Sequence, residues 1–188
     1  MRKTTTRFAA PAVILTAAAL TFTPAIVAPA SAVASAAPAA TTATVRTVDI
    51  PLTRAQKRAI KAKGTRNHLV KVAKAKKRSG AQYVAGASSS RRFDCSGFTK
   101  MLYKNVAGKD LPHYSGAQMR KGKRVSRKNL QKGDLLFWGP GGSQHVSMYI
   151  GKGKMIGANN PRSDIQIESI NAPWWRNKYA GATRLIKG

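Results

Sequence analysis

The spacing of apolar residues changes along the chain, and this change constrains the fold more than any other feature of the sequence. Between about residues 54 and 105 the apolar side chains recur at helical spacing, as at Leu69 and Ala73. From about residue 134 the spacing becomes that of strands: 134–138 is a short apolar run, and in 145–150 every second side chain is apolar. Helices followed by antiparallel strands predict an α+β fold rather than a parallel α/β fold.

The same patterns predict the individual elements. Thr53 is a suitable N-cap for a short basic helix that ends at Gly64. We expect a second basic helix over 66–78 and a third over 93–105 that opens after Asp94. The expected strands are 134–138, 145–150, 154–158, 165–170 and 180–186, with a hairpin turn at 151–153. The prediction is an antiparallel sheet of about five strands preceded by basic helices. Trp174 and Trp175 are expected in the core, and the alternative for both is the rim of a substrate site.

The first 36 residues have the pattern of a secretory signal peptide. A basic start is followed by an apolar stretch over 9–20, and small residues at 30–32 and 34–36 predict cleavage after Ala32 or Ala36. The apolar stretch is shorter than the roughly 18–20 residues that a membrane span needs. We therefore expect an exported protein without a transmembrane anchor, with a basic leader and short helix over 37–65 and one domain over 66–188.

The charge of the chain points to a polyanionic partner. There are 34 lysines and arginines against 6 acidic residues, which gives a net charge of +28. Export argues against nucleic acid and favours anionic polymers of a bacterial cell wall. Eleven basic residues and no acidic residue lie between Arg54 and Arg78, so this segment is the expected binding surface. The alternative is a solvated helix surface without a ligand.

A single cysteine, Cys95, excludes an intrachain disulfide and a cysteine-rich zinc module. At the start of a helix, backbone amides and the helix dipole are expected to lower its thiol pKa and produce a nucleophile. His145, at the start of an alternating strand, is the expected base, and His113 is a weaker candidate. The alternatives are a buried structural thiol and a strand histidine. We expect no metal and no cofactor.

Six short blocks occur in order along the domain. They are Gln82-Tyr-Val-Ala-Gly86, Phe93-Asp-Cys-Ser-Gly-Phe98, Leu111-Pro-His-Tyr-Ser-Gly-Ala-Gln118, Gly133-Asp-Leu-Leu-Phe-Trp138, His145-Val-Ser-Met-Tyr-Ile-Gly151 and Lys154-Met-Ile-Gly-Ala158. Together they resemble the NlpC-type cell-wall peptidases, which are papain-like cysteine hydrolases, over about residues 66–186. The blocks around Cys95 and His145 are specific together and weak apart.

The resemblance implies a role for each matching residue. Cys95 matches the nucleophile and His145 the general base, while Tyr83, Asp94 and Ser96 match residues that line the substrate cleft. The implied fold is papain-like, with the nucleophile helix packed on an antiparallel sheet. The implied activity is hydrolysis of peptide bonds in peptidoglycan stems, including the bond from D-glutamate to the diamino acid. With the signal peptide and the basic segment, we expect a secreted, wall-associated monomer.

One position departs from the family pattern. The residue that orients the base is expected twelve residues after it, where this chain has Gly157. We expect Asn159, or Asn160, to take this role if the strand bulges. Two alternatives remain: a non-catalytic polycationic wall-binding protein with a degenerate site, and an exported antibacterial toxin of the same chemistry.

Overall fold

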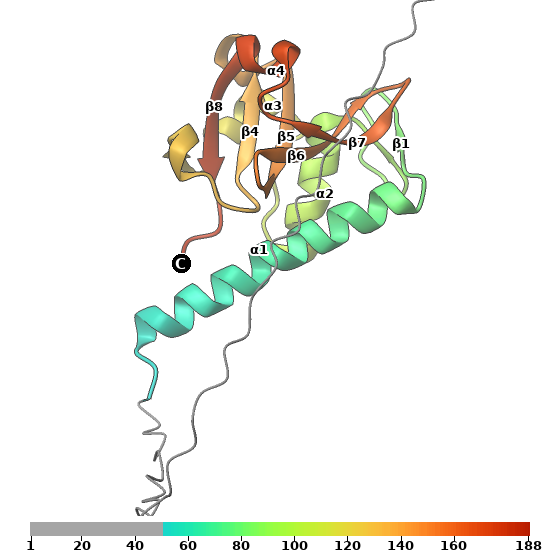
Figure 1. The fold of residues 1–188 in the computed structure, drawn as a ribbon. Helices are drawn as coiled ribbons and strands as arrows, with labels where there is room; N and C mark the ends of the chain where they lie inside the picture. The colour runs from blue at the N-terminus through green and yellow to red at the C-terminus, as the bar shows by residue number, and fades with distance from the viewer. Residues whose placement is uncertain (1–50) are drawn as a thin grey trace, which may run out of the picture. The chain divides into compact units, whose positions relative to one another are not determined.

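The computed structural model describes residues 51–188 (Figure 1). The expected signal peptide and most of the expected leader lie outside the described residues. Within them, the prediction of helices followed by an antiparallel sheet is confirmed.

One long helix replaces the two expected basic helices. Helix α1 covers Arg54–Arg78 without a break, so the expected helix end at Gly64 is wrong, and the domain boundary expected after residue 65 falls inside this helix. Thr53 is the N-cap, as expected, and forms a capping box with Gln56. A glycine within a helix costs only about 1 kcal/mol relative to alanine, and the helix contacts the domain on both sides of Gly64, through Ala62 and Leu69.

The main sheet has six antiparallel strands rather than about five. Their order across the sheet is β3-β8-β4-β5-β6-β7. The strands are β3 (Lys123–Val125), β4 (Leu135–Trp138), β5 (His145–Gly151), β6 (Lys154–Asn160), β7 (Asp164–Ser169) and β8 (Tyr179–Arg184). The strand missed by the sequence patterns is β3, which is short and largely exposed at the sheet edge. The hairpin turn at 151–153 is confirmed, with Lys152 and Gly153 both at positive φ.

Helix α2 (Cys95–Ala107) packs against the centre of this sheet. Phe98 and Leu102 of α2 share one buried cluster with Val146 and Met148 of β5. Leu69 of α1 joins the same cluster, so both long helices cover one face (Figure 1). The opposite face carries a second, smaller cluster around Trp138. The central strands β4 and β5 are therefore buried from both sides.

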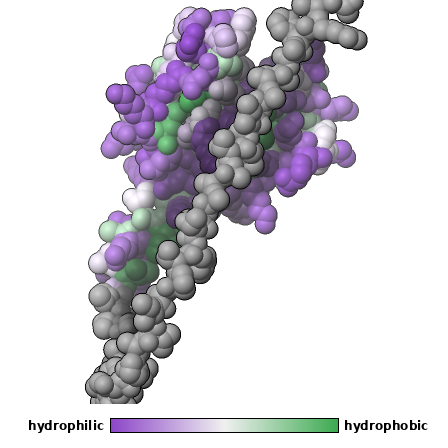
Figure 2. All heavy atoms as spheres, viewed as in Figure 1, coloured by the Kyte–Doolittle hydropathy of each residue, from purple (hydrophilic) through white to green (hydrophobic). Residues whose placement is uncertain are grey.

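Shorter elements complete the fold. Strands β1 (Gln82–Tyr83) and β2 (Arg92–Phe93) form a separate parallel pair ahead of α2. The remaining helices are α3 (Ser115–Met119), α4 (Pro173–Lys178) and the 3-10 turns η1 (Arg127–Asn129) and η2 (Pro140–Gly142). No helix among residues 51–188 combines the length and the apolar character that crossing a membrane requires. The surface seen in Figure 2 is mostly hydrophilic.

Candidate active site

The N-terminus of α2 is fixed by an aspartate cap. Asp94 has an extended backbone, and its Oδ1 atom accepts hydrogen bonds from the backbone N–H of Gly97 at 2.6 Å and from Ser96 Oγ at 3.0 Å. Aspartate is among the preferred N-cap residues because its carboxylate satisfies an amide that has no partner inside the helix. The helix therefore begins at Cys95, as the sequence predicted.

The Cys95 thiol lies between the start of α2 and strand β5. Burial raises its pKa, and the negative charge of Asp94 raises it further. The backbone of Val146, the residue after His145, lowers the pKa, as do the backbone groups of Ser96 and Cys95 itself. The expectation that the helix end lowers this pKa is wrong in its net direction, because burial outweighs the contribution of the backbone groups.

His145 is a buried histidine held between two tryptophans. It pairs with Trp138 across β4 and β5, and its ring centroid lies 5.7 Å from that of Trp138 and 4.9 Å from that of Trp175. Burial lowers the pKa of His145 to about 4, and the side chain of Asn159 opposes this shift. The imidazole is therefore uncharged at neutral pH and is able to accept a proton.

The two tryptophans expected in the core have different positions. Trp175 is half-buried and packs on His145 and Trp138, and its backbone carbonyl accepts a hydrogen bond from the Trp138 indole at 3.0 Å. The core assignment is wrong for Trp174, which is 64% exposed. The ammonium of Lys178 lies 3.5 Å above the Trp174 ring, a cation–π contact that forms without burial.

The residues expected to line the cleft gather around Cys95. The pKa of Tyr83 is raised by burial and then by the charges of Cys95 and Asp94, which places its phenol beside both. Ser96 is buried and donates to Asp94. His113, the weaker candidate base, instead places its Nε2 atom 2.9 Å from both carboxylate oxygens of Asp94.

The region around Gly157 contains two polar side chains from neighbouring positions. Ser147 on β5 has its Oγ atom 2.8 Å from His145 Nε2. The register between β6 and β7 shifts between Ala158 and Asn160, which is the bulge on which the interpretation of Asn159 depended. Asn159 donates from Nδ2 to Glu168 at 2.7 Å, and its Oδ1 atom is buried without a partner of normal geometry.

Ser147 was missed as a candidate site residue. The signal was present in the alternation of β5, because His145 and Ser147 are two residues apart and lie on the same face of the strand. Glu168, which accepts hydrogen bonds from both Asn159 and the Trp175 indole, was also missed. No sequence pattern connects Asn159, Glu168 and Trp175. They meet only because β6 has a bulge and α4 packs beside the Trp138 cluster.

Comparisons with known proteins fit this geometry. The NlpC/P60 family matches residues 80–184. The gamma-D-glutamyl-L-lysine dipeptidyl-peptidase of Bacillus cereus is 41% identical over 57% of this chain and 33% of its own length. The murein DD-endopeptidase MepS/murein LD-carboxypeptidase of Escherichia coli is 36% identical over 57% of each protein.

A solved structure shows the same fold. The crystal structure of an NlpC/P60 family protein from Bacillus cereus has 37% sequence identity and a TM-score of 0.60, over 65% of this chain and 40% of that one. This chain spans a third to just over half of the curated relatives described above. The α+β architecture is the papain-like fold of these domains. With a family match over more than half of its residues, the chain belongs to the NlpC/P60 family.

Proposed function

We propose that the protein is an exported cysteine peptidase that hydrolyses peptide bonds in peptidoglycan stem peptides. The observation that carries the proposal is the meeting of the Cys95 thiol, at the start of α2, with the backbone of β5 directly after His145. The two relatives described above, a gamma-D-glutamyl-L-lysine dipeptidyl-peptidase and a murein endopeptidase/carboxypeptidase, support the substrate class. The name of the first supports the D-glutamyl–diamino acid bond as the finer assignment.

The pKa directions define how the reaction begins. Cys95 is a thiol and His145 is a neutral imidazole at neutral pH. The thiol proton therefore moves to His145 as the sulfur attacks the carbonyl carbon, and the amides at the start of α2 stabilise the oxyanion. The imidazolium then protonates the leaving amine as the C–N bond breaks. Water, deprotonated by His145, hydrolyses the resulting thioester and releases the thiol.

The other candidate residues support this sequence of steps. Asn159 is proposed to orient His145, since its oxygen favours the protonated ring that forms during attack. Tyr83, Asp94 and Ser96 are proposed to line the substrate side of the thiol. Asp94 contributes mainly through position, because its carboxylate already binds Gly97, Ser96, His113 and the backbone N–H of Gly86.

The non-catalytic alternative depended on His145 having no polar group within reach. Ser147 Oγ is 2.8 Å from the ring, and the Asn159 side chain is near it. These contacts favour the enzyme. The toxin alternative shares the chemistry and differs only in its target, so growth assays of producing and competing cells, with and without the signal peptide, separate the two.

The test of the activity is incubation with purified peptidoglycan under reducing conditions, followed by mass analysis of the released fragments. The wild type is expected to release stem-peptide fragments, and Cys95→Ala is expected to release none. Thr183→Val is a matched control. Thr183 is also buried in the sheet, but its hydroxyl donates to the backbone carbonyl of Met119 and contacts no residue of the proposed site. Absence of cleavage by the wild type across several wall chemistries would reject the peptidase.

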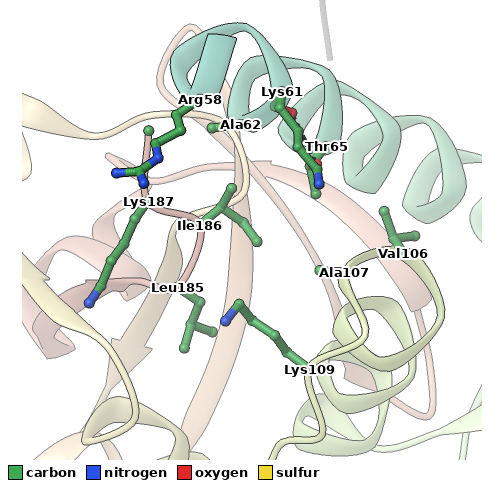
Figure 3. Close-up of a pocket in the computed structure, with 11 residues that line it drawn as sticks. Arg58, Lys61, Ala62, Thr65, Val106, Ala107, Lys109, Leu185, Ile186 and Lys187 are labelled. Carbon is green, nitrogen blue, oxygen red and sulfur yellow. Dashed lines mark hydrogen bonds between the residues drawn. The ribbon is translucent and has the colours of Figure 1, made fainter. Parts of the chain in front are cut away.

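We also propose that α1 holds the protein on anionic wall polymers. A pocket of about 670 Å³ lies where α1, the end of α2 and the C-terminal segment meet (Figure 3). Four cationic side chains surround its apolar floor: Arg58, Lys61, Lys109 and Lys187. None of the five acidic side chains in residues 51–188 lines it, although Gly188, at the carboxyl end of the sequence, does. Such an excess of positive charge favours phosphate- or carboxylate-bearing polymers.

Charge-matched variants test this attachment. Replacing Lys57, Arg58, Lys61 and Lys63 with glutamine removes four exposed charges from α1. Replacing Arg120, Lys121, Lys123 and Lys128 removes four exposed charges elsewhere. We expect the first variant to lose most wall binding, and wild-type binding to fall with added salt because charges are screened beyond about 8 Å at physiological ionic strength. Equal losses in both variants, or salt-insensitive binding, would reject the role of α1.

A further inference from the structure

We infer that Ser147 is a positioning residue for His145 and that Ser147, together with Asn159, occupies the place of the side chain that Gly157 lacks. This inference rests on the proposed function, because it assigns the group that holds the proposed base. It adds a residue on β5 to a site whose expected orienting residue was on β6.

The space beside Gly157 carries the first step. A Cβ atom added at this glycine would overlap Ser147 Oγ and would lie 3.0 Å from Asn159 Oδ1. Gly157 has no positive φ, so its backbone accepts a side chain and only these neighbours exclude one. Two oxygens from neighbouring positions therefore fill the volume in which a side chain on β6 would face His145.

The orientation of Asn159 carries the second step. Its Nδ2 atom donates to Glu168 at 2.7 Å, and Glu168 also accepts from the Trp175 indole at 2.6 Å. A carboxylate only accepts, so the amide nitrogen of Asn159 must face Glu168 and its oxygen must face the other way. The asparagine therefore presents an acceptor beside His145 and Ser147, and Trp175 stacks on the same imidazole.

The contact between Ser147 and His145, taken with the acceptor on Asn159, carries the third step, which concerns the tautomer of the base. Ser147 Oγ lies 2.8 Å from His145 Nε2. A hydroxyl can donate or accept, so the assignment rests on Asn159 Oδ1, which only accepts and gives the Ser147 hydroxyl an acceptor of its own. Ser147 then accepts from Nε2–H of His145, which leaves Nδ1 as the nitrogen with a free lone pair. In the proposed reaction that lone pair receives the proton from Cys95. Without Ser147 the buried ring loses its direct partner at Nε2, so both its tautomer and its rotation become less defined.

Two measurements on the purified protein test the inference. We expect Ser147→Ala to lower the rate of peptidoglycan hydrolysis about 10-fold or more, with KM little changed. Nitrogen NMR of the histidine rings at neutral pH is expected to show His145 protonated at Nε2 in the wild type, and this preference should be lost in Ser147→Ala. Thr183→Val, the buried-hydroxyl control, should change neither, and circular dichroism checks that every variant folds.

Moving the hydroxyl between strands is the sharper test. The pair Ser147→Gly and Gly157→Ser removes the obstructing side chain and places a hydroxyl on β6 beside the same point. We expect the double variant to recover activity and the Nε2–H tautomer relative to Ser147→Gly alone. A folded double variant with no recovery, or Ser147→Ala with wild-type rate and tautomer, would overturn the inference. If the wild type cleaves nothing, the peptidase fails while the tautomer still decides the role of Ser147.

Discussion

Helices α1 and α2 both begin with a side-chain N-cap, but they differ in their exposure and in the charge of that cap. The N-cap side chain is Thr53 in α1 and Asp94 in α2, and each accepts a hydrogen bond from a backbone N–H three residues further along the chain. The first turns of α1 are fully exposed and carry no acidic residue, whereas the first turn of α2 is largely buried and begins at a carboxylate. In this strongly basic chain an acidic residue caps the helix of the proposed site, and none lies at the start of the exposed helix.

All five carboxylates of residues 51–188 serve as structural acceptors or ion-pair partners. Asp94 caps α2 and binds His113, Asp110 pairs with Lys100, Asp134 with Arg184, Asp164 accepts from the Tyr83 backbone, and Glu168 holds Asn159 and Trp175. None is within α1. Asp94, Asp164 and Glu168 thus hold residues of the proposed site, and no carboxylate side chain of residues 51–188 forms an ion pair with a lysine or arginine of α1.

Exchanging each N-cap for alanine gives the largest expected difference between the helices. Asp94→Ala removes the α2 cap and the partner of His113, so we expect hydrolysis to fall more than about 100-fold because the thiol and the oxyanion amides lose their positions. Thr53→Ala should cost about 1 kcal/mol of stability and leave hydrolysis unchanged. Peptidoglycan assays with thermal unfolding of both variants measure this. A catalytic loss in Thr53→Ala would break the comparison.

The pH dependence of Cys95 alkylation tests the electrostatics at the start of α2. Burial and Asp94 raise the pKa of the thiol, and the pKa of His145 is about 4, so no thiolate–imidazolium pair forms near neutral pH. We expect the rate with iodoacetamide to rise about tenfold per pH unit through neutrality and to level off only at alkaline pH. Asp94→Asn keeps a cap and should move the curve to lower pH. A plateau between pH 5 and 7 would show that an ion pair exists.

The fold followed from the sequence because its determinants are local. The alternation in β5 and the start of α2 directly after Asp94 depend on residues close in the chain, and both were predicted correctly. The break at Gly64 was wrong because contacts on both sides of the glycine, through Ala62 and Leu69, outweigh a small local cost. Tertiary packing overrides weak propensities of this size.

The site was less predictable because its fine structure depends on several strands at once. Cys95 and His145 stand in recognisable blocks, and the structure places the Cys95 thiol against the backbone that follows His145. The position of Asn159 depends on a bulge in β6, and its orientation depends on Glu168 of β7. The sign of the Cys95 pKa shift depends on burial, which the residues next to Cys95 in the chain do not reveal.

Stability against acid tests the burial of His145. Its folded pKa is about 4 against an ordinary 6.5, so the unfolded chain takes up the proton first as the pH falls. The contribution is full above pH 6.5 and is lost between pH 6.5 and 4, and it amounts to about 3 kcal/mol. Denaturant unfolding of the wild type should show this loss, and His145→Gln should show a smaller one. If the free energy of unfolding depends on pH equally in the wild type and in His145→Gln, the imidazole is hydrated in the folded protein.

The smallest expected effect lies in the middle of α1. Gly64 is helical and a Cβ atom there would meet nothing within 4 Å, so Gly64→Ala should stabilise the protein by about 0.5–1 kcal/mol through the lower entropy of its unfolded chain. Hydrolysis should be unchanged, because α1 contributes no residue to the proposed site. Gly133→Ala is the contrasting variant: φ is +86° there and a Cβ would lie 3.3 Å from Leu69, so that change should destabilise. Thermal unfolding separates the two, and a destabilised Gly64→Ala would mean that α1 bends at residue 64 in solution, as the sequence first suggested.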